Sequence, residues 1–92
     1  MSEPAVVDAL DRQRYELHLD GEVAGFVDYR KREDRIVFTH AEVSPEHEGH
    51  GHGSRLARFV LDDARRQGLR VVPMCPFIAL YVERHPEYQD LL

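Results

Sequence analysis

Residues 36–53 read IVFTHAEVSPEHEGHGHG and combine a strand with a glycine-rich turn. The strand begins apolar on both faces, which is typical of a central position in a sheet. Pro45 ends it, and the rest of the stretch is a loop rich in glycine and histidine. Apolar residues then recur at helical spacing over residues 54–67, with Gly68 as the stop. A strand, a turn and a helix in this order predict the crossover unit of an α/β fold.

Shorter patterns on either side extend this unit into a sheet. Two runs of alternating residues flank Asp20-Gly21, a dipeptide that favours a two-residue hairpin turn. A short strand and a second helix follow the first helix, and Pro73 leaves one side of that strand without a ladder partner. The predicted strands cover residues 14–19, 22–29, 36–43 and 70–75, and the predicted helices cover 54–67 and 77–84. The prediction is an α/β fold in the order β-β-β-α-β-α, with a small mixed sheet in one domain over residues 1–92. Residues 1–8 are expected to be a weakly structured lead-in.

Composition and charge narrow the possible classes of protein. The 92 residues are 42% hydrophobic and 32% charged, a balance that indicates a globular rather than a disordered chain. The net charge of −5 argues against broad binding to nucleic acid or to an anionic membrane surface. A single cysteine excludes an internal disulfide, and neither a long apolar run nor an export signal is evident. A cytoplasmic protein without a membrane span is therefore expected.

The glycine-rich turn is the strongest local indication of a ligand. Its glycines let backbone N–H groups face a ligand, and the helix start adds positive potential, which together favour phosphate. Residues 47–58 contain one acid, Glu48. The residues of this stretch that can carry a positive charge are His47, His50, His52, Arg55 and Arg58. A purely structural turn is the alternative interpretation. The histidines could bind a metal, but no carboxylate or cysteine stands at an evident further position, so no metal site is predicted.

The predicted strand over residues 36–43 has two different faces. The side chains that suit burial against a helix are Val37, Thr39, Ala41 and Val43. The opposite face ends in His40 and Glu42, two titratable groups that make it a candidate wall of a cleft. The alternative is that both side chains only reach the solvent.

Cys75 ends the predicted strand after the first helix, at the edge where α/β sheets bind ligands. If the third and fourth predicted strands are neighbours, His40 and Cys75 come from adjacent strand ends near the glycine-rich turn. Two interpretations stay open for this cysteine. It is either a nucleophile with a histidine as its base, or a small buried hydrophobic residue.

The arrangement resembles the acetyl-CoA-binding core of the GCN5-related N-acetyltransferases (the GNAT superfamily). The resemblance rests first on the strand, the Gly51-x-Gly53 turn, and the helix, strand and helix that follow. The tail is more specific, because it resembles the signature of a minimal, single-domain GNAT-like group. That signature comprises Cys75-Pro76-Phe77, Tyr81 and His85-Pro86-Glu87-Tyr88. The resemblance covers the chain from about Tyr15 onward, and it implies a core without the extra N- and C-terminal elements of full-length GNAT enzymes.

The resemblance implies that acetyl-CoA is the co-substrate and that the acetyl group passes to an amine, on a small molecule or on a protein. The residues that would bind acetyl-CoA are Val43, Gly49, His50, Gly51, His52, Gly53, Ser54, Cys75, Pro76 and Tyr81. The family's Gln/Arg-x-x-Gly-x-Gly/Ala loop begins here at Glu48, which departs from the pattern. The catalytic candidates are His40 or Glu42 as general base, Tyr81 as general acid, and Cys75. Cys75 would either line the thioester channel or take the acetyl group first.

Two other functions are considered. The first is a module that binds CoA or an acyl-CoA without turnover, and the second is a small histidine-rich metal-binding protein. Neither nucleic acid nor a membrane is expected as a partner. The chain is expected to be a monomer or a weak homodimer, since the apolar Leu91-Leu92 end could support a weak contact.

Overall fold

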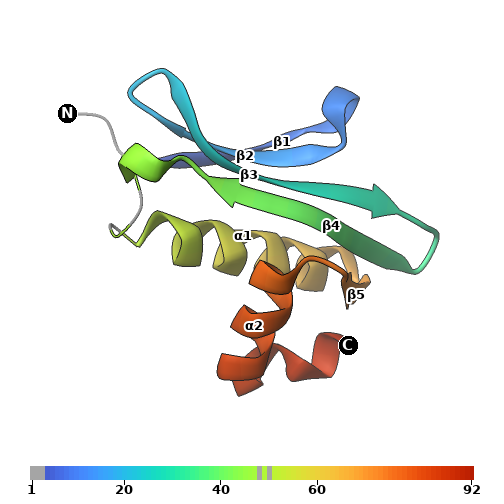
Figure 1. Ribbon diagram of the computed structural model, residues 1–92. Coiled ribbons are helices and arrows are strands. Elements are labelled where there is room, and N and C mark those ends of the chain that lie inside the picture. The colour runs from blue at the N-terminus through green and yellow to red at the C-terminus, as the bar shows by residue number, and fades with distance from the viewer. Residues whose placement is uncertain (1–3, 48, 50) are drawn as a thin grey trace.

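Five strands form one sheet in the order β1-β2-β3-β4-β5 (Figure 1). The computed structural model describes residues 4–47, 49 and 51–92. The strands are β1 (Ala5–Ala9), β2 (Arg14–Leu19), β3 (Glu22–Lys31), β4 (Arg35–Val43) and β5 (Arg70–Pro73). The helices are α1 (His52–Gln67) and α2 (Pro76–Arg84), with 3₁₀ segments η1 (Leu10–Arg12), η2 (Pro45–His47) and η3 (Pro86–Leu91). All neighbouring strands are antiparallel except β4 and β5, which are parallel and connected through α1. The predicted α/β fold with a mixed sheet is confirmed.

The core lies between the sheet and α1, because α1 packs along one face of the sheet (Figure 1). The helix α2 lies beside α1. The largest fully buried side chains are Tyr15, Phe38, Leu17, Ile36, Leu56, Leu61, Ile78, Val27 and Val60. No α-helix of the described residues covers the opposite face, which we call the open face (Figure 1). No helix in the described part of the chain is both long and apolar enough to cross a membrane.

The predicted lead-in over residues 1–8 is wrong for residues 5–8, which belong to β1. This strand pairs antiparallel with β2 along its whole length. The hydroxyl of Tyr29 also donates a 2.5 Å hydrogen bond to the carboxylate of Asp8. β1 is hard to detect in the sequence because it lies at the edge of the sheet, where its side chains are only partly buried. Residues 1–3 lie outside the described residues.

The other element boundaries lie within two residues of those predicted. After α2, where no element was predicted, the tail forms the 3₁₀-helix η3. Tyr88 and Leu91 of this helix are buried against the core. Leu91 therefore packs inside the protein, and of the apolar pair expected to support a dimer contact only Leu92 is exposed.

A β-bulge divides β4 into two segments. Tyr29 pairs with Phe38, but the preceding residue, Asp28, pairs with His40, so Thr39 has no cross-strand partner. Before the bulge, the even-numbered residues Ile36 and Phe38 face the core, and after it Ala41 packs against the core. The expected single buried face of Val37, Thr39, Ala41 and Val43 is therefore wrong, since Thr39 is exposed and Val37 is only partly buried.

Candidate functional site

A cavity of about 280 Å³ lies between the end of β4 and the start of α1. It is lined by Ala41, Glu42, Val43, Gly49, Gly51, His52, Gly53 and Phe77. We call it the donor cavity. It opens where β4 and β5 separate, because their pairing ends at Phe38 opposite Pro73. Past this point, the backbone N–H groups of Met74 and Cys75 both turn back to the carbonyl of Phe38, at 2.9 and 3.0 Å.

The glycines of the donor cavity are required by backbone conformation and by space. Gly51 precedes the first residue of α1 with φ of 77°, a left-handed conformation that favours glycine. A Cβ atom on Gly53 would lie 3.2 Å from the ring of Phe77 and 3.6 Å from a methyl group of Val43. Gly51, the N-cap residue of α1, provides no side-chain cap, and the backbone amides of the first turn point toward the cavity end of the helix. Such an end attracts anions, as the sequence pattern predicts.

Five of the ten predicted acetyl-CoA-binding residues line this cavity. Those that line it are Val43, Gly49, Gly51, His52 and Gly53. Ser54 belongs to the first turn of α1 but is not among the lining residues. Cys75, Pro76 and Tyr81 belong to the β5–α2 connection and to α2 and also do not line it. His50 lies outside the described residues.

Phe77 is the lining residue that the sequence interpretation assigned only to the family signature. Its ring lies against Gly53 and forms part of the cavity wall. A signal for this role was present in the sequence. A glycine in the first turn of a helix allows a neighbour to come close, and an aromatic residue follows the helix-starting Pro76.

Cys75 precedes α2 as its N-cap residue and is 2% exposed. Burial raises the pKa of its thiol, and the backbone amides of Ile78, Phe77 and Cys75 itself oppose this only in part. The thiol is therefore protonated at neutral pH. Its packing is that of a small core residue, one of the two interpretations left open by the sequence.

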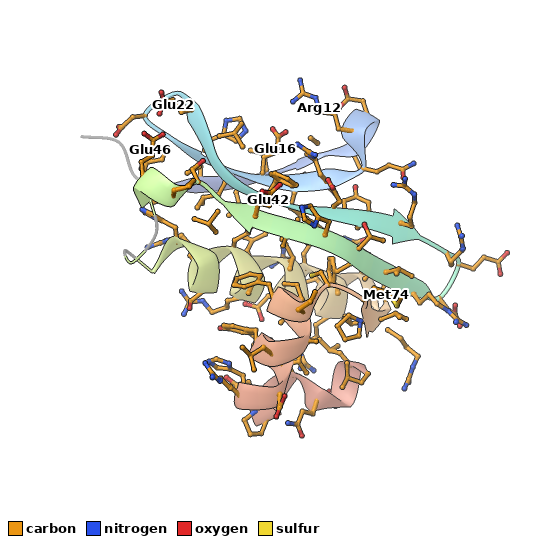
Figure 2. The ribbon with its side chains drawn as sticks, in the orientation of Figure 1. Arg12, Glu16, Glu22, Glu42, Glu46 and Met74 are labelled. Atoms are coloured by element: carbon orange, nitrogen blue, oxygen red, sulfur yellow. The ribbon has the colours of Figure 1, made fainter. Side chains whose placement is uncertain are left out.

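His40 and Glu42 lie together on the open face. Nε2 of His40 lies 3.1 Å from a carboxylate oxygen of Glu42, and the imidazole contacts the ring of Phe26. The side chain of Glu42 is 63% exposed. Figure 2 shows Glu42 on the side of the sheet away from α1. Cys75 belongs to the core on the helix side, and the described residues show no contact between it and His40. His40 belongs to β4 and Cys75 follows the neighbouring strand β5, but their side chains lie on opposite faces of the sheet.

Tyr81 stacks on His85 one turn further along the chain. The two rings are 3.8 Å apart and nearly parallel, and Nδ1 of His85 donates to the carbonyl oxygen of Tyr81 at 2.7 Å. Burial raises the pKa of the Tyr81 phenol, while the charge of Arg58 opposes that shift. The phenol is therefore protonated across the physiological range and able to donate a proton.

A metal centre has no support in the described residues, which contain no group of three metal-ligating side chains. His47 ends η2 and His52 begins α1, whereas His50 lies outside the described residues.

Comparison with known proteins agrees with this geometry. The model of a family described as GCN5-related N-acetyl-transferase matches residues 14–91. A solution structure of a GCN5-like putative N-acetyltransferase from Staphylococcus aureus is 25% identical, with a TM-score of 0.76 over 99% of this chain and 89% of that chain. The crystal structure of a ribosomal-protein-alanine N-acetyltransferase from Brucella melitensis biovar Abortus 2308 is 22% identical, with a TM-score of 0.61. It matches 75% of this chain and 55% of its own length, and it supports the fold alone. None of the curated proteins compared matches this chain.

Proposed function

Because this chain belongs to the GCN5-related N-acetyltransferase family, we propose that it transfers an acetyl group from acetyl-CoA to an amine. The observation that carries the proposal is the donor cavity. It joins the amide-rich start of α1 to the part of β4 from which β5 has separated. A phosphate-bearing, extended co-substrate fits such a site, because it needs anion binding at one end and a backbone edge along its length.

The residues of the cavity would divide the work of binding. The pyrophosphate would bind at the first turn of α1, near Gly51 and Gly53, through backbone amides. The pantetheine arm would follow β4 past Phe38 toward Val43, where β5 offers no ladder partner. Phe77 would form part of the cavity wall.

The transfer itself needs two proton movements. The nitrogen of the neutral amine attacks the carbonyl carbon of the thioester, and the C–S bond then breaks. His40 and Glu42, 3.1 Å apart on the open face, would take the proton from the amine, directly or through water. Tyr81 would give its phenolic proton to the departing CoA thiolate.

Cys75 fits direct transfer better than a covalent acetyl-enzyme. An attacking thiolate needs a lowered pKa or a base in contact, whereas burial raises the pKa of this thiol. We therefore propose that Cys75 packs beside the thioester channel. In a turnover assay with an amine acceptor, Cys75→Ala should keep at least about half of kcat. A loss of about a thousandfold, with acetyl-CoA affinity unchanged, would establish the covalent route instead.

Calorimetric titration with acetyl-CoA tests the donor site. Gly51 and Gly21 provide a matched pair, because both have left-handed φ values, 77° and 80°, and open space around a Cβ. Alanine at either position costs about 1–2 kcal/mol of backbone strain. Gly51→Ala should weaken acetyl-CoA binding about tenfold, whereas Gly21→Ala, in the β2–β3 turn, should leave it unchanged. Absence of binding by the unmodified protein at millimolar acetyl-CoA would overturn the proposal.

A transfer assay then separates the enzyme from a binding module. The enzyme consumes acetyl-CoA faster with an amine present than without it. Saturable binding with no amine-dependent consumption would support the non-catalytic alternative.

A further inference from the structure

A cavity of about 240 Å³ lies where β3 passes the segment between β1 and β2. It is lined by Leu10, Gln13, Tyr29, Arg30, Lys31 and Arg32. We call it the basic cavity, because three of these side chains are cationic and none of them is acidic. The end of β3 and the start of α1 lie at opposite ends of the sheet, so this cavity is far from the donor cavity (Figure 1).

Two of the three cations are held in place without being neutralised. Nη1 of Arg30 donates to Oε1 of Gln13 at 2.7 Å and to the carbonyl oxygen of Tyr29 at 3.1 Å. Nζ of Lys31 donates to Oε1 of Gln67 at 3.0 Å. All three acceptor groups are uncharged. The hydrogen bonds therefore fix the positions of the two cations and leave their charges available to an anion.

The third cation, Arg32, is exposed, and among the described residues its side chain has no hydrogen bond or ion pair. The acids nearest to the cavity along the chain are Asp11, Glu33 and Asp34, and none of the three lines it. Asp34 is already neutralised by Arg35 at 3.1 Å. The cavity thus presents positive charge on a chain whose net charge is −5.

The backbone of β3 has a short open edge at this cavity. Its pairing with β2 stops at Arg14, and β3 runs past that point. The amide of Tyr29 donates to the carbonyl oxygen of Gln13 at 2.9 Å, toward the side of β2. Residues two apart on an antiparallel strand point their backbone groups to the same side, so those of Lys31 also face away from β4. In the described part of the chain, no strand continues there. An extended backbone can pair with such an edge.

The remaining lining favours a peptide over a nucleic acid. Leu10 is 68% exposed and offers an apolar surface beside the cations. Tyr29 is only 3% exposed, so its ring leaves little surface on which a base could stack. A long polyanion is also repelled by the net charge of −5, whereas a few carboxylates meet only the local cations.

We propose that the basic cavity binds an extended acidic peptide segment of a partner protein. Carboxylates of the segment bind Arg30 and Arg32, an apolar side chain packs on Leu10, and the backbone pairs with Lys31. A guanidinium suits this role because it binds a carboxylate through two parallel N–H bonds. The site is independent of the proposed transfer reaction, since the basic cavity and the donor cavity share no lining residue.

The test is an NMR titration of the ¹⁵N-labelled protein with the end-capped peptide acetyl-Glu-Leu-Glu-Leu-Glu-amide. The peptide should shift the amide signals of Leu10, Lys31 and Arg32 and leave that of His52, at the start of α1, unchanged. A neutral peptide with glutamine in place of each glutamate should bind at least about tenfold more weakly, because it lacks the charges that the arginines recognise.

Two arginine substitutions provide the matched comparison. Arg32→Gln should raise the Kd for the acidic peptide at least about fivefold, because it removes a carboxylate-binding group from the cavity. Arg84→Gln removes the same charge at the end of α2, outside the cavity, and should change the Kd less than about twofold. Both arginines are exposed, and among the described residues neither has a side-chain hydrogen bond or ion pair, so both variants should fold.

Absence of shifts at the basic cavity with the acidic peptide would overturn the proposal, and so would equal effects of Arg32→Gln and Arg84→Gln. Tighter binding of an oligothymidylate at the same residues would assign the surface to nucleic acid instead.

A titration in the presence of saturating CoA separates this site from the donor site. The Kd for the peptide should stay unchanged, and displacement of the peptide by CoA would overturn a separate site. A protein that binds the peptide at the basic cavity but does not bind CoA supports the peptide site and overturns the transfer reaction alone.

Discussion

Gly53 and Phe77 both line the donor cavity and are in contact, so that a Cβ atom on Gly53 would lie 3.2 Å from Cζ of the phenylalanine ring. Any side chain at position 53 must displace that ring. Since Phe77 lines the cavity, its displacement changes the shape of the cavity directly.

Gly53→Ala should therefore weaken acetyl-CoA binding about tenfold, equivalent to 1.4 kcal/mol. The double variant Gly53→Ala/Phe77→Leu should recover part of that loss, because leucine has no atom at the position of Cζ. Calorimetric titration of both variants, with Phe77→Leu alone as reference, measures the effect. Equal affinities of Gly53→Ala and the unmodified protein would contradict the assigned wall.

The hydrogen bonds to Asp63 predict a loss of stability in acid. Burial raises the pKa of this carboxyl, but bonds from Tyr15, Arg66 and Gln67 together hold it below its usual value. A carboxyl with a lowered folded-state pKa stabilises the protein above its unfolded pKa, and this contribution is lost as the pH falls through the folded value. The free energy of unfolding should thus decrease as the pH falls below about 4.

Urea unfolding at several pH values tests this assignment. Asp63→Asn should lower stability at pH 7 by about 1–3 kcal/mol and flatten the decline below pH 4. The exposed Asp11 provides a control, and Asp11→Asn should preserve the decline. An Asp63→Asn protein with an unaltered acid profile would show that other carboxyls cause the decline.

The bond between Tyr29 and Asp8 predicts that β1 contributes to stability. Asp8→Ala leaves a partly buried phenol without its partner and should cost about 1–3 kcal/mol in urea unfolding. In a double-mutant cycle, the variant Asp8→Ala/Tyr29→Phe should lose less unfolding free energy than the sum of the two single-variant losses. The coupling between the two groups should be about 1 kcal/mol. Additive losses would mean that the two groups do not interact in solution.

The burial of Cys75 predicts slow thiol chemistry. Because burial raises the pKa of this thiol, its reaction with a thiol-specific disulfide reagent at pH 7.5 should be at least about tenfold slower in the native protein than in guanidinium chloride. Absorbance at the wavelength of the released thiolate follows the reaction. Equal rates in the two conditions would place the thiol at the surface and revive the covalent route.

Much of the fold could be predicted from sequence because its main elements carry strong local signals. The alternation around Asp20-Gly21, the helical spacing after the glycine-rich turn and the stop at Gly68 each fix an element without reference to the rest of the chain. β1 carries no such signal, because an edge strand buries too little surface to impose a pattern on residues 5–9.

The positions of the side chains at the site were harder to predict for a different reason. The bulge at Thr39 adds a single residue to β4 and reverses which side chains face the core. No residue type in this stretch of sequence indicates a bulge. Gly49, Gly51 and Gly53 of the predicted turn line the donor cavity, and the anion site predicted there depends on backbone amides rather than on side-chain direction. The expected approach of His40 to Cys75 did depend on it, and the two side chains lie on opposite faces.

The separation of β4 from β5 leaves the sheet unfinished, since parallel pairing stops after four residue pairs. Under the proposed function, the co-substrate lies where the missing pairs would be and completes the ladder in their place. The thermal stability of the domain then depends on the concentration of its own co-substrate. Binding adds about 2.7 kcal/mol at a concentration one hundredfold above Kd and almost nothing well below it. The protein would persist where acetyl-CoA is abundant and become prone to unfolding and proteolysis where it is scarce.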